Sequence, residues 1–418
     1  MQKPELKFPQ RFFWGASTSA HQVEGGTHNN WSTWELDNAK SLAKSASYKL
    51  SDMTVWPHIK TQATDPSNYV SGVAVDHYNR YKIDLAIAAK LNFNAFRFSI
   101  EWSRIEPEEG VWDLEAVEHY RDYIREIIAL GMEPLPTLYH WTVPLWFQQK
   151  GGFEKASNIE YFVRFAEKCI DEYYKYIRFI TTINEPDTVI THGYITLEHP
   201  PQKRSYRKAF WVYRNLLKAH KRIYNYAHKK SRRLKVGFTK SYAYSYAGDD
   251  QWLSKFAARL DPMVRDDVPL RYVKHHLDFI GMNYYFSDRH VGRTVANDNE
   301  KLNDLGWNMR PDDMYHVLIR LKKWKKPIII TESGVADHAD QYRRWWITQS
   351  LMAIHKALGK KVNIIGYLHW SLLDNFEWAY GRWPRFGLVE VDYADNLKRT
   401  VRPSAIWYGR VIKKIRGL

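Results

Sequence analysis

The chain carries the run PIIITESG at residues 327–334, in which three isoleucines and a threonine lead directly to Glu332. β-Branched residues favour strands, and a short apolar run that stops at polar residues and glycine is typical of a buried parallel strand. A second run, FITTINEP at residues 179–186, has the same design and leads to Glu185. The two runs therefore predict two glutamates that project from the tips of buried strands.

Short apolar runs of this kind recur along the chain and alternate with longer segments of helical pattern. The eight strand candidates lie near residues 11–17, 94–100, 133–140, 178–184, 235–241, 277–284, 327–331 and 364–370. Helical patterns are clearest from Leu114 to Leu130 and from Asn158 to Tyr176. Regular alternation favours a parallel α/β sheet, and eight such units closed on themselves form a (β/α)8 TIM barrel. We expect one domain over residues 1–418, with residues 26–75 as an elaborated loop over the barrel mouth.

Composition limits the class of protein. A hydrophobic fraction of 44% is ample for a core, and the 18 Trp and 28 Tyr residues can pack there or stack on the flat apolar faces of sugar rings. Cys169 is the only cysteine, so an intramolecular disulfide is excluded. The sequence has no run of 18 apolar residues and no apolar leader after Met1. A cytoplasmic location is the expectation.

The chain is strongly basic, with 62 Lys and Arg against 46 Asp and Glu and a net charge of +16. A nucleic-acid or other acidic partner is one explanation of such a charge. The densest basic clusters, at residues 229–233 and 322–326, lie just before candidate strands, at the strand ends opposite Glu185 and Glu332. We therefore expect a solvated basic surface, with no nucleic-acid or membrane partner. The oligomeric state stays open.

Residues with chemical functions follow the predicted strands. Active sites of these barrels lie at the carboxyl ends of the strands. Side chains suited to such a site occur at seven of the eight ends: Gln22, Arg97, His140, Asn184, Glu185, Tyr285, Glu332 and Trp370. One glutamate at a strand end is usually a structural acid, whereas two that face one pocket can share the acid/base and nucleophile roles in cleaving a glycosidic bond.

The motifs around the two glutamates are those of a known family. Asn184-Glu185-Pro186 and Thr331-Glu332-Ser333-Gly334 resemble the acid/base and nucleophile motifs of glycoside hydrolase family 1, the retaining β-glycosidases. Further agreement, in order and kind, is found at residues 8–25, 96–99, 140–141, 283–285 and 370–393, and matches extend to Tyr408. The resemblance implies a (β/α)8 barrel that hydrolyses small-molecule β-glycosides or oligosaccharides through a covalent glycosyl-enzyme. It implies no cofactor and no metal.

The resemblance also assigns roles to residues. Glu185 would be the acid/base, Glu332 the nucleophile, and Arg97 and Tyr285 the groups that keep Glu332 ionised. The residues that match substrate-binding positions of the family are Gln22, His140, Trp141, Asn184, Trp307, Trp370, Glu377, Trp378 and Phe386. Among them Trp370 would form the floor of the sugar pocket, and Trp307 the platform under the leaving group. Retaining chemistry implies carboxyl groups roughly 5–5.5 Å apart.

Specificity follows from the same comparison. Relatives that act on 6-phosphorylated sugars carry a small neutral residue at the position of Glu377, whose negative charge would repel a phosphate. The expected substrates are therefore non-phosphorylated β-glucosides, with β-galactosides and β-fucosides next. Thr142, Phe153 and Ser333 depart from the usual family residues without removing a catalytic group. A transglycosylase and a catalytically silent barrel that binds a glycoside or an acidic partner are the alternatives.

Overall fold

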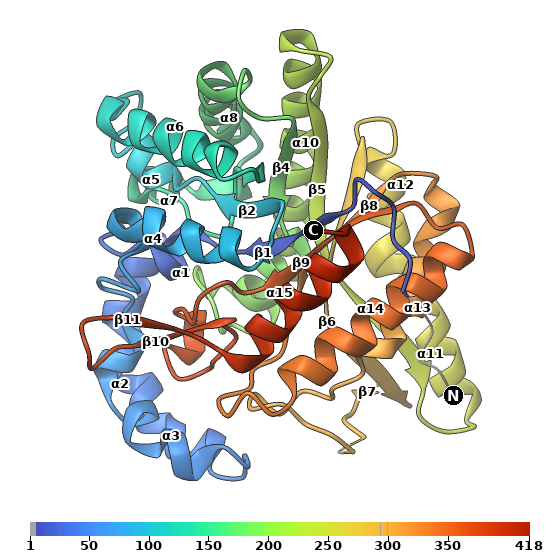
Figure 1. The fold of residues 1–418 in the computed structure, drawn as a ribbon. Coiled ribbons are helices and arrows are strands. Elements are labelled where there is room, and N and C mark those ends of the chain that lie inside the picture. The colour runs from blue at the N-terminus through green and yellow to red at the C-terminus, as the bar shows by residue number, and fades with distance from the viewer. Residues whose placement is uncertain (1–5, 293, 299) are drawn as a thin grey trace.

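An eight-stranded parallel barrel forms the centre of the molecule (Figure 1). The computed structural model describes residues 6–292, 294–298 and 300–418. The barrel strands are β1 (Phe13–Ser17), β2 (Ala95–Ser99), β3 (Glu133–Thr137), β4 (Phe179–Asn184), β5 (Lys235–Ala247), β6 (Phe279–Val291), β8 (Ile328–Ser333) and β9 (Ile364–Trp370). Neighbouring strands pair in parallel, and the β1–β9 and β5–β6 pairings close the ring. The predicted eight strands and the TIM-barrel fold are confirmed.

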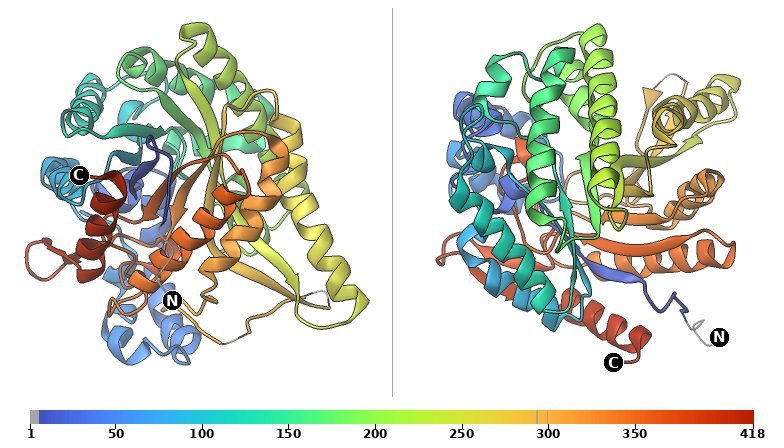
Figure 2. Two further views of the ribbon diagram at one scale, coloured as in Figure 1. Left: turned by 45° about the vertical axis from the view of Figure 1, so that its right-hand side comes forward. Right: turned by 90° about the horizontal axis from the view of Figure 1, so that it is seen from above.

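Helices surround the barrel on its outer side (Figure 2). The larger ones are α4 (His77–Lys90), α6 (Leu114–Ala129), α8 (Ile159–Tyr173), α10 (Tyr206–Lys230), α11 (Trp252–Pro262), α12 (Val268–Val273), α13 (Met314–Leu321), α14 (Arg343–Gly359) and α15 (Pro403–Arg416). Helix α6 starts where the Asp113 side chain accepts a hydrogen bond from the Ala116 N–H, and it ends before Gly131 in the left-handed region. Both helices predicted in detail, α6 and α8, are present within three residues of their expected ends.

Shorter elements connect these units. They are α1 (Ala20–Val23), α5 (Trp102–Ile105), α7 (Leu145–Gln149), α9 (Pro186–Ile190), a π-helical turn (Met263–Asp267), β7 (Thr294–Val295), β10 (Val389–Asp392) and β11 (Lys398–Val401). No helix of the described residues is both long and apolar enough to cross a membrane. The basic clusters end α10 and precede β8, so they lie at the amino ends of the strands, as expected.

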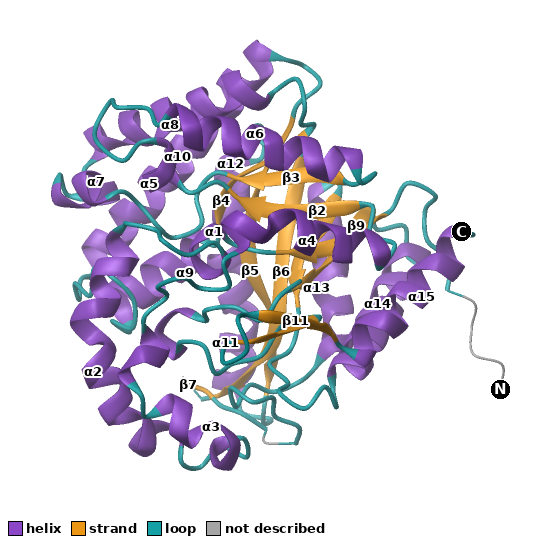
Figure 3. Cartoon of the chain, turned by 60° about the vertical axis from the view of Figure 1, so that its left-hand side comes forward, coloured by secondary structure: helices purple, strands orange, loops and turns teal. Residues whose placement is uncertain are grey.

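The segment 26–75 is an elaborated connection over the barrel mouth, as expected, but much of it is helical. It contains α2 (Asn30–Leu50) and α3 (Trp56–Ala63), which lie outside the ring of strands (Figure 3). Asn29 starts α2 with a capping box, because its side chain accepts hydrogen bonds from the Trp31 and Ser32 N–H groups and Ser32 bonds back to its N–H. Trp31 packs against Trp378 in the loop after β9, which places α2 at the barrel mouth.

Strands β5 and β6 continue well beyond the barrel rim. Each has 13 residues, and their pairing extends to the partners Ala247 and His290. The expected strands near 235–241 and 277–284 are therefore too short. The Tyr- and Ser-rich run after Ser241 extends β5 because β6 offers it a continuous edge for backbone hydrogen bonds. Helix α11 follows this extension and lies at the margin of the molecule (Figure 2).

The barrel interior is divided into an apolar and a polar end. Side chains from seven strands form a plug: Phe13, Ala95, Leu135, Phe179, Phe279, Ile329 and Leu368. Most of them come from the first residues of their strands. Polar residues occupy the last positions of the same strands, among them Ser17, Asn184 and Glu332. The plug closes the amino end, so the functional groups gather at the carboxyl end.

Candidate active site

Strand β8 ends with Glu332, whose two carboxylate oxygens are both bound by donors. Arg97, on β2 and fully buried, donates from Nη1 to Oε1 of Glu332. The Tyr285 hydroxyl, on β6, donates to Oε2 over 2.7 Å. The second guanidinium nitrogen of Arg97 donates to Oδ1 of Asn184 over 2.8 Å, which fixes the guanidinium plane. A carboxylate that is paired with a cation and accepts a phenol hydrogen bond is stabilised in its ionised form.

Glu185 is also buried, but it has no cationic partner among the described residues. Its carboxyl accepts hydrogen bonds from Asn283 Nδ2 over 2.7 Å and from the Thr188 hydroxyl over 2.8 Å. Burial, and then the negative charges of Glu332 and Asp187, raise the pKa of Glu185 to about 8. At neutral pH this carboxyl therefore holds a proton. The two glutamates face opposite electrostatic conditions within one site.

The backbone at Glu185 is strained. The residue lies between β4 and α9 with φ +41° and ψ +66°, a left-handed conformation that glutamate seldom adopts. Such a conformation costs about 1 kcal/mol or more, and it persists where the surrounding structure fixes it. Here Pro186 starts α9 directly, and the Glu185 N–H donates to the carbonyl of Thr239 on β5. This turn projects the carboxyl into the barrel mouth instead of along the strand.

A buried lysine neutralises the acid next to Glu185. Lys240, on β5, lies 2.9 Å from the carboxylate of Asp187 and 3.0 Å from that of Asp266, which belongs to the π-helical turn. Lys240 and Asp266 are buried, and Asp187 is partly buried. The ion pair limits how strongly Asp187 disfavours the ionised form of Glu185, and it joins the start of α9 to the segment before α12.

Polar groups suited to binding hydroxyls lie beside the two glutamates. Gln22 donates from Nε2 to Oε2 of Glu377 over 3.3 Å, and Asn184 Nδ2 lies 3.0 Å from Nε2 of His140. Burial, and then the positive charge of Arg97, hold the pKa of His140 well below its usual range, so the imidazole is neutral. Burial and the charge of Glu332 raise the pKa of Glu377 to about 8. Glu377 is therefore mostly protonated at pH 7, and it can donate as well as accept hydrogen bonds.

Aromatic rings form the walls around these polar groups. The His140 ring stacks between two indoles, with centroids 6.0 Å from Trp370 and 6.2 Å from Trp378. Trp141 contacts Trp378, at 4.7 Å between centroids, and donates from Nε1 to the Asn184 carbonyl over 3.1 Å. Trp307 lies in a second cluster together with Trp370, Tyr285 and Phe386. The fold thus brings together all thirteen residues that the sequence suggested for the site.

Three site residues were given no role by the sequence: Thr188, Asn283 and Thr331. Asn283 donates to Glu185 and to Asn184 Oδ1, and its own oxygen accepts a hydrogen bond from Thr331. A usable signal existed for Asn283, because it is two residues before Tyr285 and alternate strand residues share a face. Its register partner on β8 is Glu332. Strand alternation does not predict Thr188, because its position depends on the turn at Glu185.

Comparisons with known proteins agree with this geometry. The family model described as glycosyl hydrolase family 1 matches residues 5–264 and 254–416. Beta-glucosidase A of Thermotoga maritima is 30% identical, over 97% of this chain and 98% of its own. The structure of a beta-glycosidase from Pyrococcus horikoshii has a TM-score of 0.85 at 33% identity and covers 99% of this chain and 98% of its own. That of the Thermotoga maritima beta-glucosidase with glucoimidazole has a TM-score of 0.86 at 27% identity, over 99% and 100%. The chain belongs to glycosyl hydrolase family 1 and is a glycoside hydrolase.

Proposed function

We propose that this enzyme hydrolyses non-phosphorylated β-D-glycosides, β-glucosides first, by double displacement with retention of configuration. One observation carries the proposal: the two buried glutamates have opposite electrostatic surroundings. Glu332 is paired with Arg97 and accepts from Tyr285, whereas burial and nearby negative charge raise the pKa of Glu185 to about 8. An ionised nucleophile beside a protonated acid is the arrangement that retaining glycosidases need.

In the first step Glu332 attacks the anomeric carbon while Glu185 gives its proton to the leaving oxygen. The product is a glycosyl ester on Glu332, in which the carboxylate charge is lost. Since that charge is the second-largest cause of the raised pKa of Glu185, the pKa of Glu185 falls. Glu185 then accepts a proton from water, which attacks the ester from the same face that the leaving group occupied. Each of the two displacements inverts the configuration at the anomeric carbon, so the overall result is retention.

The polar groups of the sugar pocket are suited to an uncharged glycone. Gln22, His140, Asn184 and Glu377 offer both donors and acceptors, as the hydroxyls of a pyranose require. Glu377 contributes little to the exclusion of phosphorylated sugars, because it is mostly protonated at pH 7 and hardly repels a phosphate. Exclusion rests instead on the ionised Glu332 nearby and on the lack of an ion-pairing Lys or Arg at Glu377 among the described residues. The names of relatives, beta-glucosidases, favour glucosides as first substrates.

A panel of nitrophenyl β-D-glycosides tests the substrate and the stereochemistry together. We expect the highest kcat/KM for the glucoside, then the galactoside and fucoside, and no significant turnover of the 6-phosphoglucoside. Proton NMR during hydrolysis should show the β-anomer of the free sugar first, before mutarotation. Initial formation of the α-anomer would contradict double displacement, and preference for the phosphorylated sugar would contradict the proposed glycone.

The alkaline limb of the pH profile should report the proton on Glu185. Activity needs the protonated acid, so kcat/KM should fall as the pH rises through about 8. Asp187→Asn removes a negative charge and frees Lys240 to favour the ionised form, so the limb should move to lower pH. Thr188→Val removes a hydrogen bond that favours the ionised form, so the limb should move to higher pH. Glu377 ionises near the same pH, and only a limb that belongs to Glu185 moves in these two opposite directions.

A further inference from the structure

The positive charge of the enzyme is concentrated in one part of the chain. Residues 201–275 contain nineteen Lys and Arg against five Asp and no Glu, a net charge of +14 out of the total of +16. This segment includes α10, β5, α11, the π-helical turn and α12. Lys240 is buried in the barrel, and residues 229–235 lie at the amino ends of the strands. The remaining cations lie along α10 and the helical segment from Trp252 to Val273, or directly beside them at Lys203, Arg204 and Lys274.

The helical segment from Trp252 to Val273 exposes an apolar stripe. Six apolar or aromatic residues recur every four positions and are all exposed: Trp252, Phe256, Leu260, Val264, Val268 and Tyr272. Trp252 is 74% exposed, Phe256 54% and Val268 59%. The residues that face the barrel, such as Asp266, Leu270 and Val273, are buried. Apolar residues at helical spacing normally cover a core, whereas here they form the outer face.

Helix α10 extends this face. Its first turns expose Tyr206 (75%), Phe210 (61%) and Trp211 (43%). The two helical segments are in contact, because the Lys221 ammonium lies over the Tyr272 ring at 4.3 Å from the centroid. Nearly half of the exposed large apolar side chains among the described residues belong to these two segments. Together with the apolar stripe they form what we term the basic apolar face.

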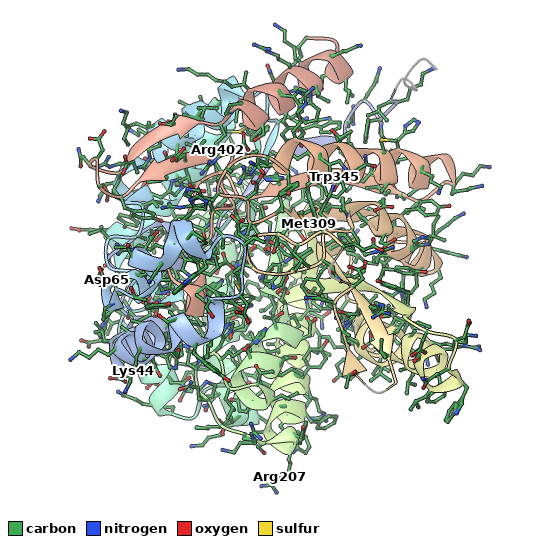
Figure 4. All side chains as sticks on the ribbon, turned by 90° about the horizontal axis from the view of Figure 1, so that it is seen from below. Lys44, Asp65, Arg207, Met309, Trp345 and Arg402 are labelled. Atoms are coloured by element: carbon green, nitrogen blue, oxygen red, sulfur yellow. The ribbon has the colours of Figure 1, made fainter. Side chains whose placement is uncertain are left out.

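Cations accompany the apolar residues on both segments. Among the described residues, Arg207, Arg214, Arg259, Arg271 and Lys274 take part in no ion pair. The side chain of Arg207 projects at the very edge of the molecule (Figure 4). Four of the five acids in the segment are already paired, namely Asp250, Asp261, Asp266 and Asp267, with Lys255, Arg265, Lys240 and Lys323. The face therefore combines exposed apolar area with uncompensated positive charge.

We propose that the basic apolar face docks this enzyme on the surface of a membrane that contains anionic lipids. Exposed Trp, Phe and Leu beside Lys and Arg on one helix are the composition of helices that lie in the membrane interface. The indole and phenol groups of Trp252, Trp211, Tyr206 and Tyr272 suit the headgroup level, and the cations attract anionic headgroups. The face supplies apolar side chains and cations, and the membrane supplies an apolar interface and anionic headgroups.

Other occupants of the face fit less well. A second copy of the chain would bring its own cations against these, and like charges at an interface oppose association. A nucleic acid would match the cations but not the aliphatic side chains of Leu260, Val264 and Val268. The proposal departs from the expectation that no membrane is involved. That expectation rested on the placement of the two densest basic clusters and on the lack of a long apolar run, and neither excludes a helix that lies on the membrane surface.

Binding to lipid vesicles tests the proposal with the whole enzyme. We expect the wild type to sediment with vesicles of phosphatidylglycerol and phosphatidylcholine but not with phosphatidylcholine alone. The triple variant Trp252→Ser, Phe256→Ser, Leu260→Ser should lower the partition coefficient by about tenfold or more, because it removes the apolar part of the contact. The triple variant Arg259→Gln, Arg271→Gln, Lys274→Gln should lower it by about a hundredfold, at roughly fivefold for each cation.

Matched variants elsewhere serve as controls. Leu36→Ser, Tyr48→Ser, Ile83→Ser removes three apolar side chains that are on average more exposed than those of the test variant, and Arg410→Gln, Lys413→Gln, Lys414→Gln removes three exposed cations of α15. Both should bind vesicles as the wild type does. Hydrolysis of a soluble nitrophenyl glucoside should be unchanged in every variant, which verifies that each one is folded. That readout depends only on the active site, so failure of the docking proposal leaves the proposed function intact.

Several results would overturn membrane docking. One is that the wild type does not bind anionic vesicles. Another is that the control variants lose as much vesicle binding as the variants of the basic apolar face. If the apolar variant binds vesicles and DNA as tightly as the wild type, the face is a simple polyanion site. If the wild type is a dimer without lipid and the apolar variant a monomer, by analytical ultracentrifugation, the face belongs to a second copy of the chain.

Discussion

Replacement of Glu332 by alanine is expected to abolish hydrolysis, with a fall in kcat on the order of 10⁶-fold, the size seen when a nucleophile is removed. The reason is geometric, because Arg97 and Tyr285 hold this carboxylate at the end of β8, where the proposed mechanism needs its nucleophile. The shorter side chain leaves space beside these two donors. Azide or formate should enter it, attack an activated substrate directly and restore turnover. The rescued product, a glycosyl azide when azide is used, should have the α configuration, since only one inversion occurs.

Glu133→Ala is the matched control for this variant. Glu133 begins β3 at the opposite end of the barrel, where it pairs with the exposed Arg178. Its removal should leave kcat within about twofold, as expected for a pair near the surface. Rescue of Glu332→Ala to a β-configured product, or activity near that of the wild type without azide, would remove Glu332 from the mechanism.

Glu185→Gln should separate substrates by the quality of their leaving group. Glutamine keeps the hydrogen bond from Asn283 but cannot give a proton, so aglycones that need protonation should lose about 10³-fold in kcat/KM. A dinitrophenolate leaves without protonation, and its glycoside should lose less than about tenfold. The ratio kcat/KM is the proper measurement, because it reports the step up to the glycosyl-enzyme and is independent of the later, base-assisted step.

Hydrolysis of the dinitrophenyl glycoside by the same variant should show no alkaline limb near pH 8, in contrast to hydrolysis by the wild type of a glycoside whose leaving group needs protonation. Equal losses for good and poor leaving groups would show that Glu185 is not the proton donor. Thr188→Val is a useful companion, because it perturbs the same carboxyl without removing its proton, and its losses should not depend on the leaving group below the alkaline limb.

The fold was largely predictable because its signals are local. The β-branched runs that lead to Glu185 and Glu332 became β4 and β8, and the two glutamates lie at the ends of these strands as expected. Arg97 and Tyr285 lie instead in the middle of β2 and of the extended β6. Helix α2 was not predicted because its outer face is rich in Ser and Lys, and its inner face has small alanines beside only a few large apolar residues. The protonated state of Glu377 was equally hidden. It arises from burial and from the charge of Glu332, which is 45 positions away along the chain. Neither of these causes can be predicted from the residues next to Glu377 in the sequence.

The apolar stripe shows a different limit. Its spacing of four residues is visible in the sequence, and by the usual reasoning it would indicate a helix face that covers the core. The structure buries the opposite side of the same helix through Ser254, Asp266, Leu270 and Val273. Periodicity therefore indicates an amphipathic helix but not which side the rest of the molecule covers. That choice depends on the β5–β6 extension, which holds α11 away from the barrel.

The pairing of β1 with β9 has a consequence for how an active molecule is made. Ser17 is in register with Trp370, so the ring is completed by two segments more than 340 positions apart. A ribosome must synthesise nearly nine-tenths of the chain before the last barrel strand exists, and until then β1 has an open edge that invites wrong pairing. Trp370, Glu377, Trp378 and Phe386 all arrive with or after that strand. A nascent chain is therefore inactive until β9 closes the barrel. A shortened transcript that ends before β9 yields a chain with no partial activity.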